Sequence, residues 1–384
     1  MERKKIAVFT QWYLPGTKAG GPVRSIHSLI HLLKDEFDFF VVTTNCDLGK
    51  NEPYPNVAPD TVFAADGISY YYFSPSNYNS TTVLKLLDVI NPSLVYLNSF
   101  WSFSFSIRFV LMSYSARIKC PVLLAPRGML SNGARSIKPF KKNSYLFFAR
   151  FFGLYKSILF HSTQEQETKE ISRYFPKSKI FFAPNLNALP VAKNNSTKEI
   201  NSLKLFYLSR ISPVKNLLFG IEVLKNISSQ YKIEYAIYGN LEDKEYWQLC
   251  ENEISKLPGN ISVNYKGELP FHQIQPQLMH EQVLFLPTLN ENFGHSIVES
   301  LLCGCPVIIS DQTPWNNLKE NEVGFSLPLN DKNSFVKAIE HFARMNPEEF
   351  FVVSKKANDY ISGKINLAKT KDLYKKMFYG CVKN

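Results

Sequence analysis

A rhythm of short apolar runs separated by helix-like segments occurs twice along the chain, and it constrains the fold more than any other feature. In the first half these runs lie at 6–10, 38–44, 68–73, 94–99, 121–126, 157–163 and 179–185. After a polar stretch they recur at 204–210, 232–239, 261–267, 282–287, 306–310 and 323–327. Strands that alternate with helices predict parallel sheets with right-handed crossovers. We therefore expect an α/β protein with two Rossmann-like parallel-sheet domains facing a cleft.

The length of 384 residues also favours two domains, because a single core rarely serves a chain of this size. The polar stretch at 191–202 has the composition of a linker. We expect the first domain at 1–190 and the second at 200–365. The tail, 366–384, reads as a further helix over its last part.

Positive charge is concentrated in the first half. Residues 1–190 carry +10 of the net charge of +11, and no acidic residue occurs between Asp88 and Glu165. A one-sided field of this kind predicts an anionic partner. Nucleic acid is disfavoured, because no zinc-finger spacing, RNA-recognition run or helix-turn-helix pattern is present.

The cellular setting follows from two further features. Six scattered cysteines in a chain of this size are typical of a reducing compartment. No uninterrupted apolar run of about 18 residues occurs, and the start, MERKKIAVF, reads as a strand and not as a signal peptide. We expect a cytoplasmic protein.

The segment around 138–156 favours contact with a membrane. On a helix, Lys138, Lys141, Lys142 and Lys156 would share an arc of about 100°, with Phe and Tyr over much of the remainder. Lysines beside aromatic rings suit an anionic bilayer surface, so the basic region 108–156 predicts peripheral contact. The alternative is a solvated helix face that covers a core.

A polar loop between two strand-like runs is the most informative local motif. It reads LNENFGHSIVESLLCGCP and places Glu291 in the loop and Glu299 in the helix that follows. Ser296 is expected to cap that helix, so that the backbone amides of Ile297, Val298 and Glu299 point toward an anion. The alternative is structural: Ser296 and Glu299 fit a capping box, and Glu291 is an ordinary solvated acid.

Two cations follow the first strand of the second half, in LSRISPVKN. Arg210 ends the strand and Lys215 stands at a helix start, which suits a diphosphate. Many surface loops also hold an Arg and a Lys, so the motif alone is weak. Gly239 follows the next strand, where the lack of a Cβ allows close backbone approach, although an ordinary turn glycine fits as well.

Two loops in the first half also follow strands. Gly20 and Gly21 lie between the first strand and a helix, in a loop that is not a dinucleotide fingerprint and that could be a simple flexible turn. Arg127 follows the strand PVLLAP. An arginine cannot act as a base but stabilises negative charge, and the alternative for Arg127 is a buried or helix-capping role.

Taken together, E-x-F-G-H-x-x-x-E, then C-G-C-P-V-I and S-D-Q-T-P-W, resemble the donor-sugar site of retaining family-4 glycosyltransferases, which have the GT-B fold. The resemblance is tight over 286–320 and looser elsewhere. It implies an acceptor-binding first domain, a donor-binding second domain, and a last helix that crosses back onto the first domain. It also implies that Arg210 and Lys215, with the amides near Gly294, His295, Ser296 and Ile297, neutralise a leaving diphosphate.

The same resemblance implies the remaining roles. Glu291 would hold the transferred sugar and Glu299 the ribose, while Gly20, Gly21 and Gly239 approach the donor. Where many family members have a histidine, this chain has Arg127, and the P-R-G-M variant is similar to a subgroup associated with bacterial surface polysaccharides. Glu167 matches an acidic position of the family, with a supporting role.

We therefore expect a hexosyltransferase that moves a sugar from a UDP- or GDP-linked donor to a hydroxyl of a glycan or lipid-linked oligosaccharide. The anomeric configuration would be retained, and no metal or other cofactor would be needed. Two alternatives stay open: a GT-B epimerase or phosphorylase, and a non-catalytic subunit that binds a nucleotide sugar.

Overall fold

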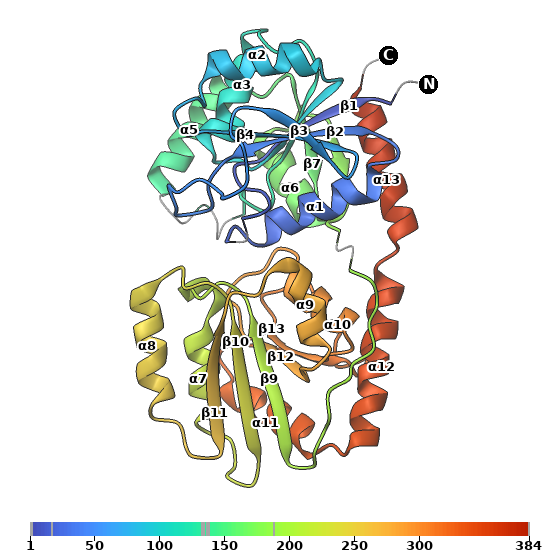
Figure 1. Cartoon of the computed structure of the whole chain (residues 1–384). Coiled ribbons are helices and arrows are strands. Elements are labelled where there is room, and N and C mark those ends of the chain that lie inside the picture. Colours follow the sequence, from blue (N-terminus) through green and yellow to red (C-terminus); the bar gives the residue numbers. More distant parts are fainter. Residues whose placement is uncertain (1–2, 17, 132–134, 136–138, 187–188, 383–384) are drawn as a thin grey trace. The chain divides into compact units, whose positions relative to one another are not determined.

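The computed structural model describes residues 3–16, 18–131, 135, 139–186 and 189–382. The chain divides into two compact units (Figure 1). The first consists of residues 1–188 and 367–384, and the second of residues 189–366. Lys138 and the other residues between these ranges lie outside the described part of the chain.

The first unit is built on an eight-stranded sheet with the order β3-β4-β2-β1-β5-β6-β7-β8. Its strands are β1 (Lys5–Phe9), β2 (Asp38–Thr44), β3 (Val62–Ala65), β4 (Ile68–Phe73), β5 (Leu94–Asn98), β6 (Val122–Ala125), β7 (Ile158–Ser162) and β8 (Ile180–Phe182). All neighbouring pairs are parallel except β3 with β4. Because β1 pairs with both β2 and β5, the strand order reverses between β1 and β5, where open α/β sheets commonly bind ligands.

Strand β3 was not expected from the sequence. It is exposed along its whole length and pairs antiparallel with β4 through a turn at Asp66 and Gly67. Both turn residues have positive φ, 52° and 76°, which is the conformation that Asp-Gly favours in a two-residue hairpin. The Asp-Gly dipeptide is the sequence signal for this hairpin, because β3 itself has no buried apolar run.

Helices cover both faces of this sheet (Figure 1). They are α1 (Gly21–Leu33), α2 (Ser80–Ile90), the π-helix η1 (Phe103–Ile107), α3 (Arg108–Tyr114), α5 (Pro139–Phe151), α6 (Glu165–Tyr174) and α13 (Leu367–Cys381). One core contains residues of α1 and α13, and a second core contains residues of α2, α3, α5 and α6. Helix α13 follows the second unit in sequence but belongs to the first: Phe378 is fully buried beside Phe37, and the Tyr374 hydroxyl donates to the Pro184 carbonyl at 3.0 Å.

The second unit has a six-stranded, fully parallel sheet with the order β11-β10-β9-β12-β13-β14. The strands are β9 (Ser202–Leu208), β10 (Lys232–Tyr238), β11 (Ile261–Gly267), β12 (Val283–Leu286), β13 (Val307–Ser310) and β14 (Gly324–Leu327). The helices are the 3₁₀ turn η2 (Pro213–Lys215), α7 (Leu217–Leu224), α8 (Lys244–Ile254), α9 (Phe271–Leu278), α10 (His295–Leu302), α11 (Lys332–Arg344) and α12 (Pro347–Lys364). Here the order reverses between β9 and β12, which pair with each other.

The polar stretch 191–202, expected as a linker, is hydrogen-bonded to the second unit. The Ala192 amide donates to the Leu302 carbonyl and the Asn195 amide to the Met279 carbonyl, both at 2.7 Å. The Asn194 side chain donates to the Glu281 carbonyl at 2.9 Å. These bonds replace water at the polar groups, so a polar composition here reflects an ordered extended segment.

The expected fold class is confirmed: the chain has two α/β units, each with a predominantly parallel sheet. Each strand predicted from an apolar run overlaps a strand of the structure. Within the described residues, no helix has the length and apolar character needed to cross a bilayer.

We predict that Gly239→Ala strongly destabilises the second unit. Gly239 has φ 155°, and an added Cβ would lie 1.8 Å from the Ser209 carbonyl oxygen, which is backbone and cannot move aside. We expect a loss of about 3 kcal/mol or more in the free energy of unfolding, measured by urea titration. Gly259→Ala is the control, since an added Cβ there meets nothing within 4 Å. Equal unfolding midpoints for the two variants would contradict the prediction.

Candidate functional site

Backbone hydrogen bonds tie three loops together at the carboxyl edge of the second sheet. The Leu289 amide, after β12, donates to the Val214 carbonyl, after β9, at 2.8 Å. The Thr288 hydroxyl donates to the same carbonyl at 3.1 Å. The Glu291 amide donates to the Gln312 carbonyl, after β13, at 3.1 Å. The loops that follow β9, β12 and β13 therefore form one framework at the point where the strand order reverses.

Lys215 and Glu291 meet on this framework. The Lys215 Nζ lies 2.6 Å from the Glu291 Oε2, and their side chains are only 12% and 18% exposed. The other carboxylate oxygen of Glu291 accepts from the Asn292 amide at 3.1 Å. Lys215 ends the 3₁₀ turn η2 and does not start a helix as expected, because Asn216, with φ 56°, separates it from α7. A partly buried cation and carboxylate in contact can each exchange the other for a charged or hydroxyl-bearing ligand.

Helix α10 begins beside this pair, but the expected cap was wrong. The N-cap is Gly294 and not Ser296, and no side chain caps the helix. Gly294 has φ 79°, and an added Cβ would lie 2.8 Å from Ile297 Cδ1 and 3.4 Å from Glu291 Cγ. Only glycine adopts that conformation readily, so the backbone places the helix start one residue before Ser296.

The first-turn amides of α10 are consequently those of His295, Ser296 and Ile297. The Val298 amide, which was expected to be available, donates to the Gly294 carbonyl at 3.0 Å and makes the first bond of the helix. Amides before that bond have no acceptor within the helix. Together with the positive end of the helix dipole, these amides create a positive potential that attracts an anion.

Glu299 lies on the same helix but is fully buried. Its neighbour Cys303 is also buried, and burial, followed by the charge of Glu299, raises the pKa of the Cys303 thiol to about 12. A ligand reaches Glu299 only if the groups that cover it move. The structure thus brings Lys215, Glu291 and Gly294 together and leaves Glu299 behind that surface.

Arg210 pairs with a different acid. Its Nη1 lies 2.6 Å from the Glu242 Oε1, and both side chains are more than a third exposed. Its carbonyl accepts from the Tyr207 hydroxyl at 2.8 Å. The sequence reasoning missed Glu242, although it stands three residues after Gly239 at the carboxyl end of β10, the position that singled out the glycine.

Gly239 itself is required by the packing of the sheet. Its amide donates to the Gly267 carbonyl at 2.8 Å, and its Cα faces the Ser209 carbonyl. The close backbone approach expected at Gly239 is therefore to Ser209, in the loop that follows β9.

An aromatic group also borders the start of α10. The Trp315 Nε1 donates to the Phe293 carbonyl at 2.6 Å, and the rings of Phe293 and His295 lie 4.8 Å apart. Trp315 had not been proposed as a site residue, although it stands in the S-D-Q-T-P-W motif. Its indole holds the Phe293 backbone and thereby the turn that leads to Gly294.

Arg127, in the first unit, is held by protein oxygens. Its guanidinium donates to Asn185 Oδ1 at 2.5 Å, Asn98 Oδ1 at 2.8 Å and the Tyr96 hydroxyl at 3.0 Å. Its backbone has φ 56°. These contacts connect the carboxyl ends of β5, β6 and β8, so the geometry fits the structural alternative for Arg127.

Glu167 supports the same edge. Its carboxylate accepts from the Gly128 amide at 2.6 Å and from the Thr163 amide at 2.7 Å. Gly20 is the N-cap of α1, with φ 65°, and Gly21 is the first residue of that helix. These glycines and Arg127 belong to a different compact unit from Lys215 and Glu291.

Among the described residues of 138–156, the lysines do not share one side of a helix, contrary to the prediction from the sequence. Helix α5 ends at Phe151, and Gly153, with φ 65°, turns the chain before Lys156. The Lys142 Nζ turns inward and lies 5.3 Å from the centre of the Trp101 ring. Of the four lysines in the predicted arc, Lys141 alone lies on the described helix with its side chain exposed.

Residues 190–360 match the family model described as "Glycosyl transferases group 1". The chain is 26% identical over 215 residues to the Escherichia coli UDP-Gal:alpha-D-GlcNAc-diphosphoundecaprenol alpha-1,3-galactosyltransferase. It is 23% identical over 159 residues to the Caenorhabditis elegans GDP-Man:Man(3)GlcNAc(2)-PP-Dol alpha-1,2-mannosyltransferase. These alignments cover 53% and 39% of this chain, and the chain spans about half and a third of the two relatives, 52% and 33% of their lengths.

Solved structures show the same fold. The Anabaena protein HepE, in complex with UDP and glucose, aligns with a TM-score of 0.70 and 15% identity, covering 98% of this chain and all of that chain. A sucrose-phosphate synthase from Thermosynechococcus elongatus aligns with a TM-score of 0.69 and 14% identity, again over 98% of this chain and 100% of that chain. At this identity, the similarity establishes the GT-B fold.

We predict energetic coupling between Lys215 and Glu291. In a double-mutant cycle with Lys215→Met and Glu291→Gln, the free energies of unfolding should be non-additive by about 1–2 kcal/mol, because either single change leaves a partly buried charge without its partner. The exposed pair Lys232 and Glu234, 3.7 Å apart, is the control and should couple by about 0.5 kcal/mol or less. Additive effects at Lys215 and Glu291 would show that the contact carries no energy.

We also predict that His161 makes the chain acid-sensitive. His161 is fully buried between the Tyr96 hydroxyl and the Ala183 carbonyl, and burial, followed by the charge of Arg127, lowers its pKa to about 3. Below about pH 6.5 the unfolded chain binds a proton at this residue and the folded chain does not. The free energy of unfolding should therefore fall with decreasing pH, by at most about 1.4 kcal/mol per unit from this group between about pH 6 and pH 4.

Urea titrations across that range should give a shallower slope for His161→Gln. His27, whose pKa is lowered to about 4 by burial and by His31, accounts for part of the slope that remains. The exposed His272→Gln variant is the control and should keep the wild-type slope. A slope that His161→Gln leaves unchanged would contradict this prediction.

Proposed function

We propose that this chain, whose residues 190–360 carry a group 1 glycosyl transferase domain, transfers a hexose from a nucleotide-diphosphate donor to a hydroxyl of a lipid-linked glycan. The observation that carries the proposal is the Lys215–Glu291 pair beside the first turn of α10, at the carboxyl edge where β9 and β12 meet. A cation, the first-turn amides of a helix and a carboxylate in one place suit a sugar diphosphate: the first two bind the phosphates and the third binds sugar hydroxyls.

In this proposal, the donor diphosphate replaces Glu291 as the partner of Lys215. The first-turn amides of α10 and the guanidinium of Arg210 add positive potential around the leaving group. Glu291, released from the lysine, accepts hydrogen bonds from hydroxyls of the transferred sugar. Electrostatic stabilisation of the leaving charge is then the main catalytic effect, and these cations do the work for which other transferases use a metal.

We propose that transfer retains the anomeric configuration. The acceptor oxygen forms its bond to the anomeric carbon on the face from which the diphosphate leaves. The acceptor proton passes to an oxygen of the leaving phosphate, so that the bond broken, the bond formed and the proton balance without another base. Glu299 would hold the donor ribose only after the groups that bury it rearrange.

The curated relatives support the substrate class. One is named for a UDP-linked donor and the other for a GDP-linked donor, and both names give lipid diphosphate acceptors. We therefore propose a UDP- or GDP-linked donor, a polyprenyl-diphosphate-linked acceptor, and a cytoplasmic site of action in the synthesis of a cell-surface polysaccharide. Arg127 would then act by positioning the carboxyl edge of the first sheet.

The first experiment is a thermal-shift screen of nucleotide sugars. A donor at about 100 times its dissociation constant adds about 2.7 kcal/mol to the free energy of unfolding and should raise the melting temperature clearly. The screen identifies the base and the sugar. If none of the UDP- or GDP-linked sugars stabilises the protein, the proposal is overturned.

We predict that Lys215→Ala lowers the rate of sugar transfer about 10²–10³-fold, because one preorganised group that stabilises the leaving charge is lost. The assay uses a polyprenyl-diphosphate sugar as acceptor and measures the release of nucleoside diphosphate. NMR then identifies the anomer of the product. Lys232→Ala is the matched control, because Lys232 is 70% exposed in its side chain and pairs weakly with Glu234. A Lys215→Ala rate equal to that of the control would remove Lys215 from the mechanism.

The same assay separates the alternatives. An epimerase changes the donor and a phosphorylase consumes phosphate, so release of nucleoside diphosphate only in the presence of the glycan acceptor would exclude both. A non-catalytic subunit would bind the donor without turnover, and Glu291→Ala would then weaken binding with no rate to lose.

A further inference from the structure

Five exposed phenylalanines lie on the outward face of helix α5 and directly after its last residue. Phe140, Phe147 and Phe151 are 84%, 66% and 75% exposed and follow one another at helical spacing, and Phe148 and Phe152 are both 55% exposed. We call these five residues the aromatic face. On the opposite side of the helix, Leu146 and Ala149 are buried in the core of the first unit. Contiguous apolar surface of this kind usually marks a site that contacts a partner or a membrane.

Positive charge borders the aromatic face. Lys141 and Arg150 are exposed on the same helix. Beside it, the Arg135 and Arg173 guanidinium carbons lie 5.1 Å and 5.9 Å from the centre of the Tyr174 ring. The charge of Glu170 interacts with that of Arg135. The sequence provides no acid between Asp88 and Glu165, and the whole of α5 falls within that interval.

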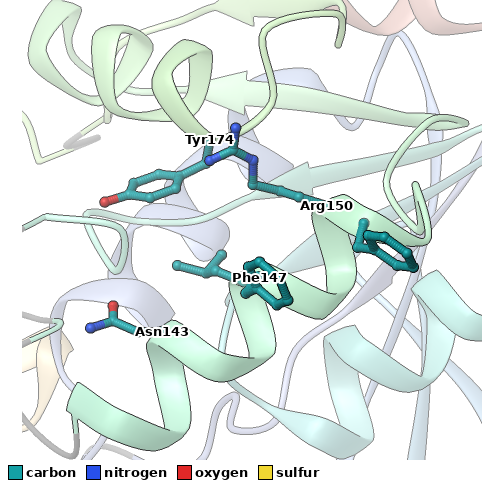
Figure 2. Close-up of a pocket in the computed structure, with 6 residues that line it drawn as sticks. Asn143, Phe147, Arg150 and Tyr174 are labelled. Atoms are coloured by element: carbon teal, nitrogen blue, oxygen red, sulfur yellow. The ribbon is translucent and has the colours of Figure 1, made fainter.

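A hollow of about 530 Å³ opens between these two kinds of side chain. Figure 2 shows Arg150 and Tyr174 along one side and Phe147 across from them, with Asn143 at one end. Leu146 and Phe151 complete the lining. The wall is therefore cationic on one side and apolar on the other, as suits a molecule with an anionic head and a hydrocarbon body.

The charge decides what covers this surface. A second copy of the chain would bring Lys141 and Arg150 against their own equivalents, and like charges at short range repel. An acidic protein would satisfy the cations but would not need five aromatic rings that point outward. An anionic bilayer satisfies both, because phosphates meet the cations while the rings enter the boundary between headgroups and acyl chains.

We propose that the first unit docks on anionic phospholipid bilayers through the aromatic face of α5, with a lipid phosphate against Arg150. The docking needs neither donor nor acceptor sugar, so it is measured separately from transfer. It would keep the protein on the surface that holds lipid-linked substrates. Its failure would leave the proposed transferase activity untouched.

The test is sedimentation of the full chain with vesicles, without nucleotide. We expect binding to vesicles of phosphatidylcholine mixed with phosphatidylglycerol and at least about tenfold weaker binding to phosphatidylcholine alone. Phe147→Ser with Phe151→Ser should lower binding to the mixed vesicles at least about tenfold, because two rings no longer enter the interface. Lys141→Glu with Arg150→Glu should also weaken binding and remove the preference for the anionic lipid.

The control is Phe351→Ser with Val352→Ser, which removes two apolar side chains of similar exposure, 56% and 51%, from α12 in the second unit. It should bind vesicles as the wild type does. The melting temperature of each variant shows that it is folded. In a Phe151→Trp variant, brominated lipids should quench the new fluorescence, which a purely electrostatic contact would not produce.

Equal binding to both kinds of vesicle, or equal binding by the wild type and the α5 variants, would overturn the proposal. A concentration-dependent dimer in solution that Phe147→Ser with Phe151→Ser abolishes would assign the face to a second copy and overturn it as well.

Discussion

The fixed meeting of three loops at the carboxyl edge of the second sheet is the constraint on which the candidate site depends. Main-chain hydrogen bonds from Leu289 to Val214 and from Glu291 to Gln312 hold the loops in place through backbone atoms alone. Lys215 and Glu291 then compensate each other's charge in a setting where water is partly excluded. Without that compensation, the desolvation of each charge would oppose folding. The pair is therefore both a structural contact and a place prepared for exchange with a charged ligand.

The sequence predicted the sheets and the location of the candidate site well. The reason is topological: once strands are parallel, residues that follow them lie at one edge of the sheet. Lys215 and Glu291 could therefore be placed at the same edge from the sequence alone. Details that depend on backbone dihedral angles were not predictable in the same way. A serine is normally the better cap, yet a left-handed Gly294 starts α10, because the turn from Glu291 needs a residue without a Cβ.

Two other differences show where local patterns reach their limit. The periodicity over 138–156 assumed one helix, but α5 ends at Phe151, and the exposed side of that helix is aromatic while Lys142 turns inward. The position of Arg127 was predictable, and its orientation was not. Whether an arginine after a strand faces a ligand or its own protein depends on neighbours distant in sequence, here Asn98 and Asn185.

The return of α13 to the first unit has a consequence for biosynthesis. Four buried residues of α13, Tyr374, Met377, Phe378 and Cys381, complete a core whose other buried residues end at Leu186. The face that α13 covers therefore stays open to water while the ribosome produces the whole of the second unit. The later unit can reach its native state first, and the earlier one waits, with apolar surface uncovered, for the last helix to emerge.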